Sequence, residues 1–234
     1  MDHFLSKSGC FAVIGLLLIS GCKTLELKPN SVASFSNEEK TAEIESTFSK
    51  SELLISSARK FERAGQIEEA IKLYEKVVKS GANREKSHEA NRHLAILYDL
   101  SDQTAKARNA FKLAMEHDNP EVDLLNDYGY FLMKNQDYSE ALEILSSAHS
   151  QSPENERVAT NLGMALVSSG RVEEGYKLFA SVVESPEAAS NVGAVLLQLG
   201  ETQAAEKWLQ QAVDSNHDGG ISIARNMLKM ANQK

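Results

Sequence analysis

The side chains that most often carry catalysis form no recognisable constellation in this sequence. The histidines lack the H-x-x-x-H spacing that sets two imidazoles on one helix face, and no G-x-S-x-G, P-loop or dinucleotide fingerprint occurs. The histidines are His3, His88, His93, His117, His149 and His217. The carboxylate pairs Glu68/Glu69 and Glu173/Glu174 stand where helices are expected to begin, and acids there offset the positive helix end. We therefore expect no enzyme, no metal site and no cofactor.

Composition and charge narrow the possible partners. The chain has 234 residues and a formal net charge of −8, a length suited to one domain or one repeat array. An acidic chain is a poor match for the phosphate backbone of nucleic acid, and plain solubility is the simplest reason for the acidity. Both cysteines, Cys10 and Cys22, lie in the first 22 residues, so the rest of the chain offers no disulfide framework or zinc spacing.

The N-terminus has the pattern of a secretory signal. Lys7 precedes an apolar run of nine residues, Phe11–Ile19, which is too short to span a bilayer but suits the core of a signal peptide. The next residues, Ile19-Ser20-Gly21-Cys22, resemble the lipobox of bacterial lipoproteins. That resemblance implies removal of residues 1–21, acylation of Cys22 and attachment by a lipid anchor. An ordinary signal peptide or a short membrane anchor with an incidental cysteine is the alternative.

The segment after Cys22 reads as a tether. Residues 22–50 are polar and rich in serine, and part of this stretch is expected to be helical. In lipoproteins of enteric bacteria an aspartate after the acylated cysteine favours the inner membrane, whereas this chain has Lys23. The resemblance therefore implies an outer-membrane protein that faces the periplasm.

Small residues recur in pairs twelve positions apart, and each pair marks a place where two helices cross closely. Bulky residues follow at helical spacing, such as Leu132 three positions after Gly129 and Leu145 four positions after Ala141. The same offsets place Val182 on the second helix of the fourth hairpin. The pairs are Ala58 and Ala70, Ala95 and Ala107, Gly129 and Ala141, Gly163 and Gly175, and Gly193 and Ala205. Such hairpins cannot bury their apolar sides alone, so they are expected to stack on one another.

Turns and helix starts supply a second measure of the repeat. Gly65, Gly170 and Gly200 are expected in the turns inside hairpins, in a left-handed conformation. Asn119-Pro120, Ser152-Pro153 and Ser185-Pro186 recur every 33 residues and are predicted to begin first helices. Because only seven residues separate Pro186 from Gly193, the first helix of the last repeat is predicted to be about one turn short.

These offsets resemble the tetratricopeptide repeat, a helical hairpin of about 34 residues. The resemblance implies an all-α fold, a right-handed solenoid of about five hairpins over residues 51–218. Residues 219–234 follow as a C-terminal capping helix, with Ile221, Ala224 and Leu228, together with Met227, over the open end.

The tetratricopeptide resemblance also implies a concave groove, lined by first helices, that takes a protein partner. Asn161 and Asn191 are placed to hydrogen-bond a peptide backbone, while some of the other residues are equally able to serve only repeat-to-repeat packing. Family geometry assigns the following residues to this groove: Arg92, Ile96, Asn126, Tyr130, Met133, Thr160, Asn161, Met164, Val167, Asn191, Ala194 and Leu197.

A lipid-anchored array of this size is similar to the pilotin-like lipoproteins of pilus systems, including those of the Tad/Flp and type IV pili. The stretch Leu125–Leu132, LNDYGYFL, carries that likeness. It implies a non-enzymatic protein that binds a secretin or another component of a pilus or secretion system, with no nucleic acid as partner. The alternative is a periplasmic adaptor that binds cell-wall hydrolases or proteases.

Overall fold

Eleven helices make up the part of the chain that the computed structural model describes, which is residues 49–116, 119–215 and 221–231. All these residues belong to one compact unit, Ile44–Lys234. The predicted signal peptide, Cys22 and nearly all of the predicted tether lie outside the described residues. None of the described helices combines the length and apolar character needed to cross a membrane.

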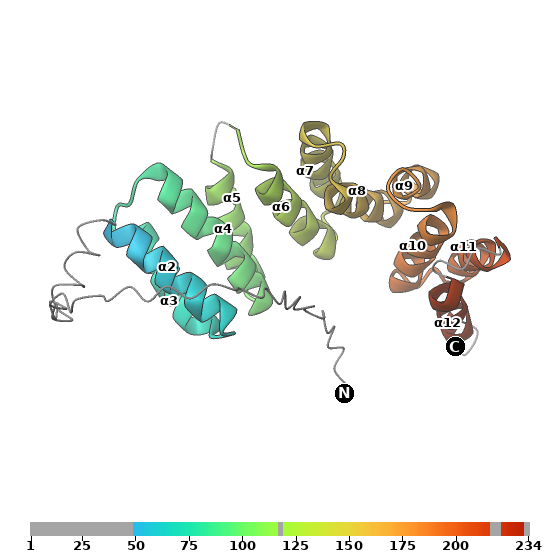
Figure 1. The fold of residues 1–234 in the computed structure, drawn as a ribbon, viewed down its shortest axis with the longest axis horizontal. Coiled ribbons are helices and arrows are strands. Elements are labelled where there is room, and N and C mark those ends of the chain that lie inside the picture. Colours follow the sequence, from blue (N-terminus) through green and yellow to red (C-terminus); the bar gives the residue numbers. More distant parts are fainter. Residues whose placement is uncertain (1–48, 117–118, 216–220, 232–234) are drawn as a thin grey trace, which may run out of the picture. The chain divides into compact units, whose positions relative to one another are not determined.

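The helices pack as five successive hairpins followed by one more helix (Figure 1). The first helices of the hairpins are α2 (Lys50–Arg63), α4 (Arg84–Leu100), α6 (Val122–Lys134), α8 (Glu156–Ser168) and α10 (Ser185–Gln198). Their partners are α3 (Ile67–Lys79), α5 (Thr104–Met115), α7 (Tyr138–Gln151), α9 (Val172–Phe179) and α11 (Thr202–Asp214), and the last helix is α12 (Ile221–Ala231). Each second helix also packs on the next first helix, which confirms the predicted all-α array of stacked hairpins.

Local sequence explains where several helices begin. Ser49 and Glu52 form a reciprocal capping box at the start of α2, and the Asn83 and Asn155 side chains accept backbone N–H groups at the starts of α4 and α8. Glu68/Glu69 and Glu173/Glu174 fall in the first turns of α3 and α9, as expected. The paired acids therefore serve helix initiation.

The turns inside the hairpins require a left-handed residue. Gly65, Gly170 and Gly200 have φ values of 71°, 88° and 81°, which confirms the prediction. Asp102 and Gln136 take the same role in the second and third hairpins, with φ of 57° and 65°. The left-handed backbone conformation is thus kept at turns without glycine, so the glycine residues alone mark only three of the five turns.

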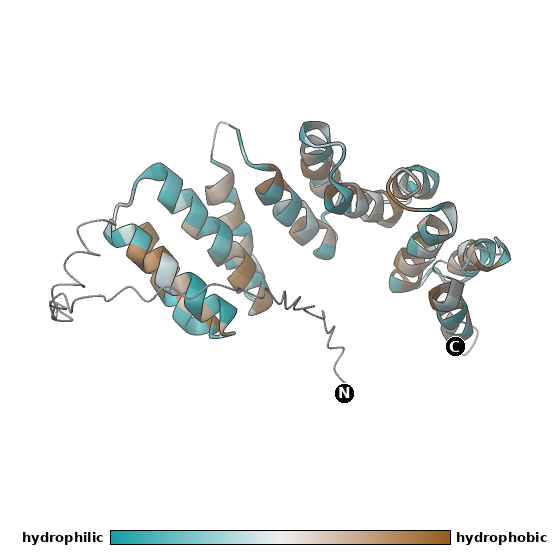
Figure 2. Ribbon diagram, viewed as in Figure 1, coloured by the Kyte–Doolittle hydropathy of each residue, from teal (hydrophilic) through white to brown (hydrophobic). Residues whose placement is uncertain are grey.

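All ten small residues of the predicted pairs are buried, each pair divided between the two helices of one hairpin. A Cβ on Gly129 would lie 2.4 Å from Cγ of Leu145, and one on Gly175 would lie 2.8 Å from the carbonyl oxygen of Gly163. These distances are shorter than any ordinary carbon contact, so close helix approach is the reason for the small side chains. Figure 2 shows hydrophilic and hydrophobic residues mixed along the helices.

The interior of each hairpin holds one large residue from the second helix. Tyr74, Phe111, Leu145, Phe179 and Leu209 are all at most 1% exposed, each four positions after the small residue of its helix. Burying a side chain of this size contributes roughly 1.5–3 kcal/mol. At the end of the array Ala224 of α12 is fully buried on Ala189, Leu209 and Ala212, and Met227 and Leu228 pack beside it. The predicted covering role of α12 is therefore confirmed for these residues, whereas the side chain of Ile221 is outside the described set.

The predicted short helix is in the wrong place. Helix α10 has 14 residues, whereas α9 has only 8 and ends at Phe179. Val182 was predicted to continue α9, but it lies in the turn that follows, where its N–H bonds the carbonyl of Phe179 at 3.0 Å. The shortened helix is therefore α9, which ends early. Helix α10 keeps its full length, because Pro186 in its first turn fixes where it begins.

The proline pattern marks a helix start only once. Pro186 lies in the first turn of α10, as predicted. Helix α6, however, begins after Glu121, and α8 begins after Asn155, so Pro120 and Pro153 stand in the preceding loops. The interval of 33 residues records where the chain leaves one hairpin for the next, and capping by Asn155 sets the actual start of α8.

Candidate functional site

The predicted groove residues all lie on first helices, and together we call them the first-helix face. Arg92 and Ile96 come from α4, Asn126, Tyr130 and Met133 from α6, Thr160, Asn161, Met164 and Val167 from α8, and Asn191, Ala194 and Leu197 from α10. Consecutive first helices contact each other from α2 to α10. The predicted groove residues thus come from four first helices that pack side by side.

A network of charged side chains crosses this face from α4 to α8. Asp127 accepts two hydrogen bonds from Arg92 through one oxygen, at 3.1 Å from Nε and 2.7 Å from Nη2. Its other oxygen lies 3.6 Å from Arg157, which also pairs with Asp123 at 2.5 Å. Asp127 is only 17% exposed, so charge-assisted hydrogen bonds hold it strongly. This network fixes three consecutive hairpins relative to one another.

Neighbouring pairs extend the same arrangement in both directions along the helices. Arg59 of α2 pairs with Glu89 of α4 at 2.5 Å, and Lys134 of α6 pairs with Asp99 of α4 at 3.0 Å. Sequence reasoning missed Asp127, Asp99 and Glu89 as parts of this surface. Opposite charges about one repeat apart were the available signal, since Arg92–Asp127 and Asp99–Lys134 are both separated by 35 positions.

Asn126 and Asn161 bind each other across the face. The Nδ2 of Asn161 donates to Oδ1 of Asn126 at 2.9 Å, and Asn126 is buried, with 2% exposed. Met133 and Val167 are also buried, at 8% and 1% exposed. Asn126, Met133 and Val167 therefore pack beneath the exposed side chains, so a partner would contact the more exposed members of the first-helix face.

The exposed members form an apolar row. Ile96, Tyr130, Met164 and Ala194 each follow the small crossing residue of their helix by one position, and Tyr130 is 44% exposed. Ile96, Met164 and Ala194 are half-buried. Among the described residues the exposed large hydrophobic side chains are Leu100, Tyr130, Leu199 and Ile223, and Tyr130 is the aromatic one, a residue type typical of anchors in protein interfaces.

The step from α8 to α10 differs from the steps before it. Here the neutral side chains of Thr160 and Asn191 occupy the positions that Asn126 and Asn161 hold one step earlier. Leu197 is half-buried there and packs against the core cluster that includes Val167 and Val192. The first-helix face is therefore ionic toward α4 and uncharged toward α10.

Three tyrosines connect the helices through carboxylates. Tyr74 donates to Glu62, Tyr98 to Glu75 and Tyr128 to Glu140, at 2.8–2.9 Å. Burial, followed by the bond to Glu75, raises the pKa of Tyr98 to about 12. Burial also raises the pKa of Tyr74 and Tyr128. These phenols therefore stay protonated at neutral pH and serve as hydrogen-bond donors.

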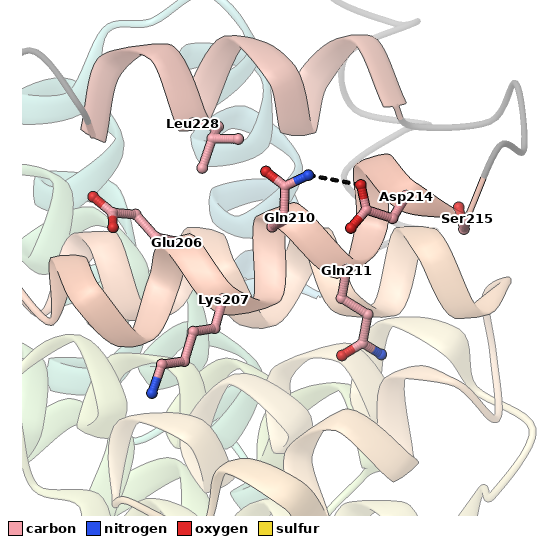
Figure 3. Close-up of a pocket in the computed structure, with 7 residues that line it drawn as sticks. All are labelled: Glu206, Lys207, Gln210, Gln211, Asp214, Ser215 and Leu228. Atoms are coloured by element: carbon pink, nitrogen blue, oxygen red, sulfur yellow. Dashed lines mark hydrogen bonds between the residues drawn. The ribbon is translucent and has the colours of Figure 1, made fainter.

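Two cavities lie near the N-terminal and C-terminal ends of the array. One, of about 370 Å³, lies where α2, α4 and the start of α6 meet and is lined by Arg59, Glu89, Arg92 and His93 among others. The other, of about 890 Å³, lies between α11 and α12 (Figure 3). There Gln210 donates to Asp214 at 2.7 Å, and Leu228 is the single contribution of α12 among the lining residues. Among the described residues no cluster of three or more His, Cys, Asp or Glu could hold a metal ion.

Sequence comparison identifies helical repeats in most of this region. Two tetratricopeptide-repeat family models match residues 132–186 and 187–216, from the end of α6 to the end of α11. A PPR repeat model matches residues 59–81, which cover the first hairpin from the middle of α2. No curated protein sequence matches the chain significantly.

Solved structures share the fold at low sequence identity. YrrB, described as a TPR protein with an unusual peptide-binding site, superposes with a TM-score of 0.61 and 20% identity, over 85% of this chain and 99% of that chain. PilF of Pseudomonas aeruginosa gives 0.54 and 19%, over 77% and 88%. PilW, described as a widely conserved type IV pilus biogenesis factor, gives 0.55 and 19%, over 71% and 78%. The described part of the chain is an all-α array of stacked hairpins that ends in a terminal helix, and the tetratricopeptide-repeat matches over residues 132–216 make it consistent with a tetratricopeptide-repeat solenoid.

Proposed function

We propose that this protein is a non-enzymatic scaffold that binds a protein client on its first-helix face and assists assembly of a pilus or a secretin. The observation that carries the proposal is Tyr130, which is 44% exposed at the middle of an apolar row running over four first helices. Large apolar side chains left in water, beside fixed polar groups, are what a protein interface requires.

The chemistry of the face favours a polypeptide as the partner. Ile96, Tyr130 and Met164 offer apolar contacts, and methionine adapts to differently shaped side chains. The ion pairs around Asp127 hold the first helices in place before binding, which lowers the entropic cost of association. Asn191, half-buried and next to this row, offers a carboxamide for a peptide backbone.

The assignment to pilus or secretin assembly rests on likeness. PilF and PilW share the fold of this chain, and PilW is a widely conserved type IV pilus biogenesis factor. The lipobox-like residues Ile19–Cys22 add an expected lipid anchor, and Lys23 favours the outer membrane with the array in the periplasm.

The anchor is tested by Cys22→Ala in cells. We expect the variant to leave the membrane fraction and to lose incorporation of a labelled fatty acid, because a thiol is needed for acylation. Lys23→Ala is the matched control and should remain lipidated and membrane-bound. A Cys22→Ala protein that stays in the membrane fraction would refute the lipid anchor.

The client is tested by crosslinking in intact cells. A photoreactive phenylalanine at Tyr130 should yield a covalent adduct with a secretin or another pilus component, identified by mass spectrometry. The same group at Lys177, exposed on α9, is the control and should not give that adduct. Recovery of murein hydrolases or proteases without a secretin would favour the alternative, a periplasmic adaptor for cell-wall enzymes.

The position of the binding surface needs its own variant. Tyr130→Ala removes an exposed ring and leaves the core intact, so we expect unchanged helicity and a loss of client adducts formed from a second probe at Asn191. Combining it with Met164→Glu, which adds a charge to the same row, should abolish binding. Retained binding in a folded double variant would place the client elsewhere on the chain.

A further inference from the structure

A cavity of about 380 Å³ lies between α3, α4 and α5, away from the first-helix face. Asn91, Leu94 and Tyr98 line it from α4 and form a single helical row. At 100° per residue this row points about 150° away from Arg92 and Ile96, which belong to the first-helix face. The cavity is therefore a separate surface from the proposed client site.

Asn91 is unusual for its position. It is 6% exposed, yet within the described part of the chain its carboxamide makes no hydrogen bond. The other two buried polar residues are satisfied, since Asn126 accepts from Asn161 and Ser190 donates to the carbonyl of Pro186. The carboxamide atoms of Asn91 are not among the fully buried atoms without a partner, so they keep contact with solvent, and they line the wall of a cavity large enough for a ligand.

The other hairpins place apolar residues where this one has Asn91. The residue four positions before the crossing residue is Leu54, Leu125, Ala159 or Ala189 in the remaining first helices. Leu125 is 2% exposed and packs on Ala148 and Val158. The other four first helices thus carry an apolar side chain at this position, and Asn91 is the polar exception.

The walls of the cavity combine apolar surface with positive charge. Val78, Leu94 and Leu113 supply the apolar part. At the end near Tyr98, Glu75 is occupied by Lys79 and by the phenol, at 2.8 Å each. Lys106 lies 5.2 Å above the Tyr98 ring and bonds the neutral Gln103, and it forms no ion pair with a described residue. Two lysines against one glutamate leave this end positive.

We propose that this cavity binds a partner polypeptide through a segment in which an apolar residue is followed by an acidic one. The Asn91 carboxamide, with its donor and acceptor in one plane, pairs with a backbone peptide group of that segment. The apolar side chain lies against Val78 and Leu113, and the carboxylate lies near Lys106. Charge complementarity and the carboxamide that lines the cavity together select this class of ligand over a neutral or basic one.

Minimal peptides test each contact separately. In titrations of the ¹⁵N-labelled chain, Ac-Leu-Glu-NH₂ should shift the Asn91 side-chain amide and the backbone amides of Val78 and Leu113, saturating on the order of 1 mM. Ac-Leu-Gln-NH₂, which lacks the charge, should bind about two- to five-fold more weakly. Ac-Ala-Glu-NH₂, which lacks most of the apolar side chain, should bind about ten-fold more weakly.

Two variants decide the assignment. Asn91→Leu, which installs the residue found at position 125, should fold and bind Ac-Leu-Glu-NH₂ at least about ten-fold more weakly. Lys106→Gln should remove the preference for the glutamate peptide over the glutamine peptide, and it does not touch the core. Tyr130→Ala is the control and should change neither result. Unchanged binding in folded Asn91→Leu, an unaltered charge preference in Lys106→Gln, or shifts confined to the first-helix face would each overturn the proposal.

Discussion

Replacing Gly175 by alanine tests how closely α8 and α9 approach each other. A Cβ at this position would lie 2.5 Å from Cγ2 of Val167 and 2.8 Å from the carbonyl oxygen of Gly163. Ordinary contacts at a Cβ are 3.4–4 Å, so α9 has to move outward by more than half an ångström. The carbonyl belongs to helical backbone and cannot rotate away, and Phe179 packs against Gly163 from the same helix.

Two opposing effects set the size of the change. Overpacking a buried contact costs roughly 1–3 kcal/mol. Alanine, however, favours the helix over glycine by about 1 kcal/mol. We therefore expect a net loss of up to about 2 kcal/mol, which corresponds to a fall in Tm of up to about 8 °C for a chain of this length. Thermal and urea unfolding followed by circular dichroism measure both quantities.

The sign of the effect is the decisive result. If the close approach were absent, helix propensity alone would make Gly175→Ala more stable by about 1 kcal/mol. Gly129→Ala is the matched comparison, because its added Cβ meets only the side chain of Leu145, which can adjust. We expect it to be less destabilising than Gly175→Ala. Stabilisation of the Gly175→Ala protein would refute the argument from helix contact.

Three further substitutions test the interior and the charge network. Phe179→Ala, at a fully buried side chain, should cost about 3–5 kcal/mol in urea unfolding. Arg92→Met should cost about 1–2 kcal/mol because it leaves Asp127 without its main donor, and the difference from wild type should shrink in high salt. Burial and then the Glu75 bond raise the pKa of Tyr98 to about 12, so the folded state holds this proton more tightly than the unfolded one. Its stabilisation is complete below about pH 10 and is lost as the pH rises through about 12, and Tyr98→Phe should reduce that alkaline loss in urea midpoints.

Much of the fold follows from local pattern. Pairs such as Ala58 and Ala70 recur at a fixed spacing because every hairpin meets the same steric demand at its crossing. Gly170 marks a turn because a left-handed residue is required there. The pattern gave a wrong prediction for the short helix. The distance from Pro186 to Gly193 shows that the repeat is shorter, but it does not show that α9 rather than α10 is the shorter helix.

The sequence predicted which helices carry the candidate site residues, but it did not predict which of their side chains contact each other. Family offsets found Tyr130 and Met164 on the first-helix face, but they did not show that Asn126 and Asn161 bind each other. They also omitted Asp127, which holds Arg92. Helical periodicity says which side of a helix a residue faces, whereas the rotation of one hairpin on the next decides which residue it meets.

By itself the sequence determined the hairpin period, the expected signal and lipid-anchor pattern, and the side of each helix that is buried. These properties depend on neighbouring residues and on a repeat of 3.6 positions per turn. Only the tertiary structure decided that charges 35 positions apart form a network and that Asn91 lines a cavity. The physical reason is that such contacts depend on the packing angle and axial offset between hairpins, which side chains from several helices set together.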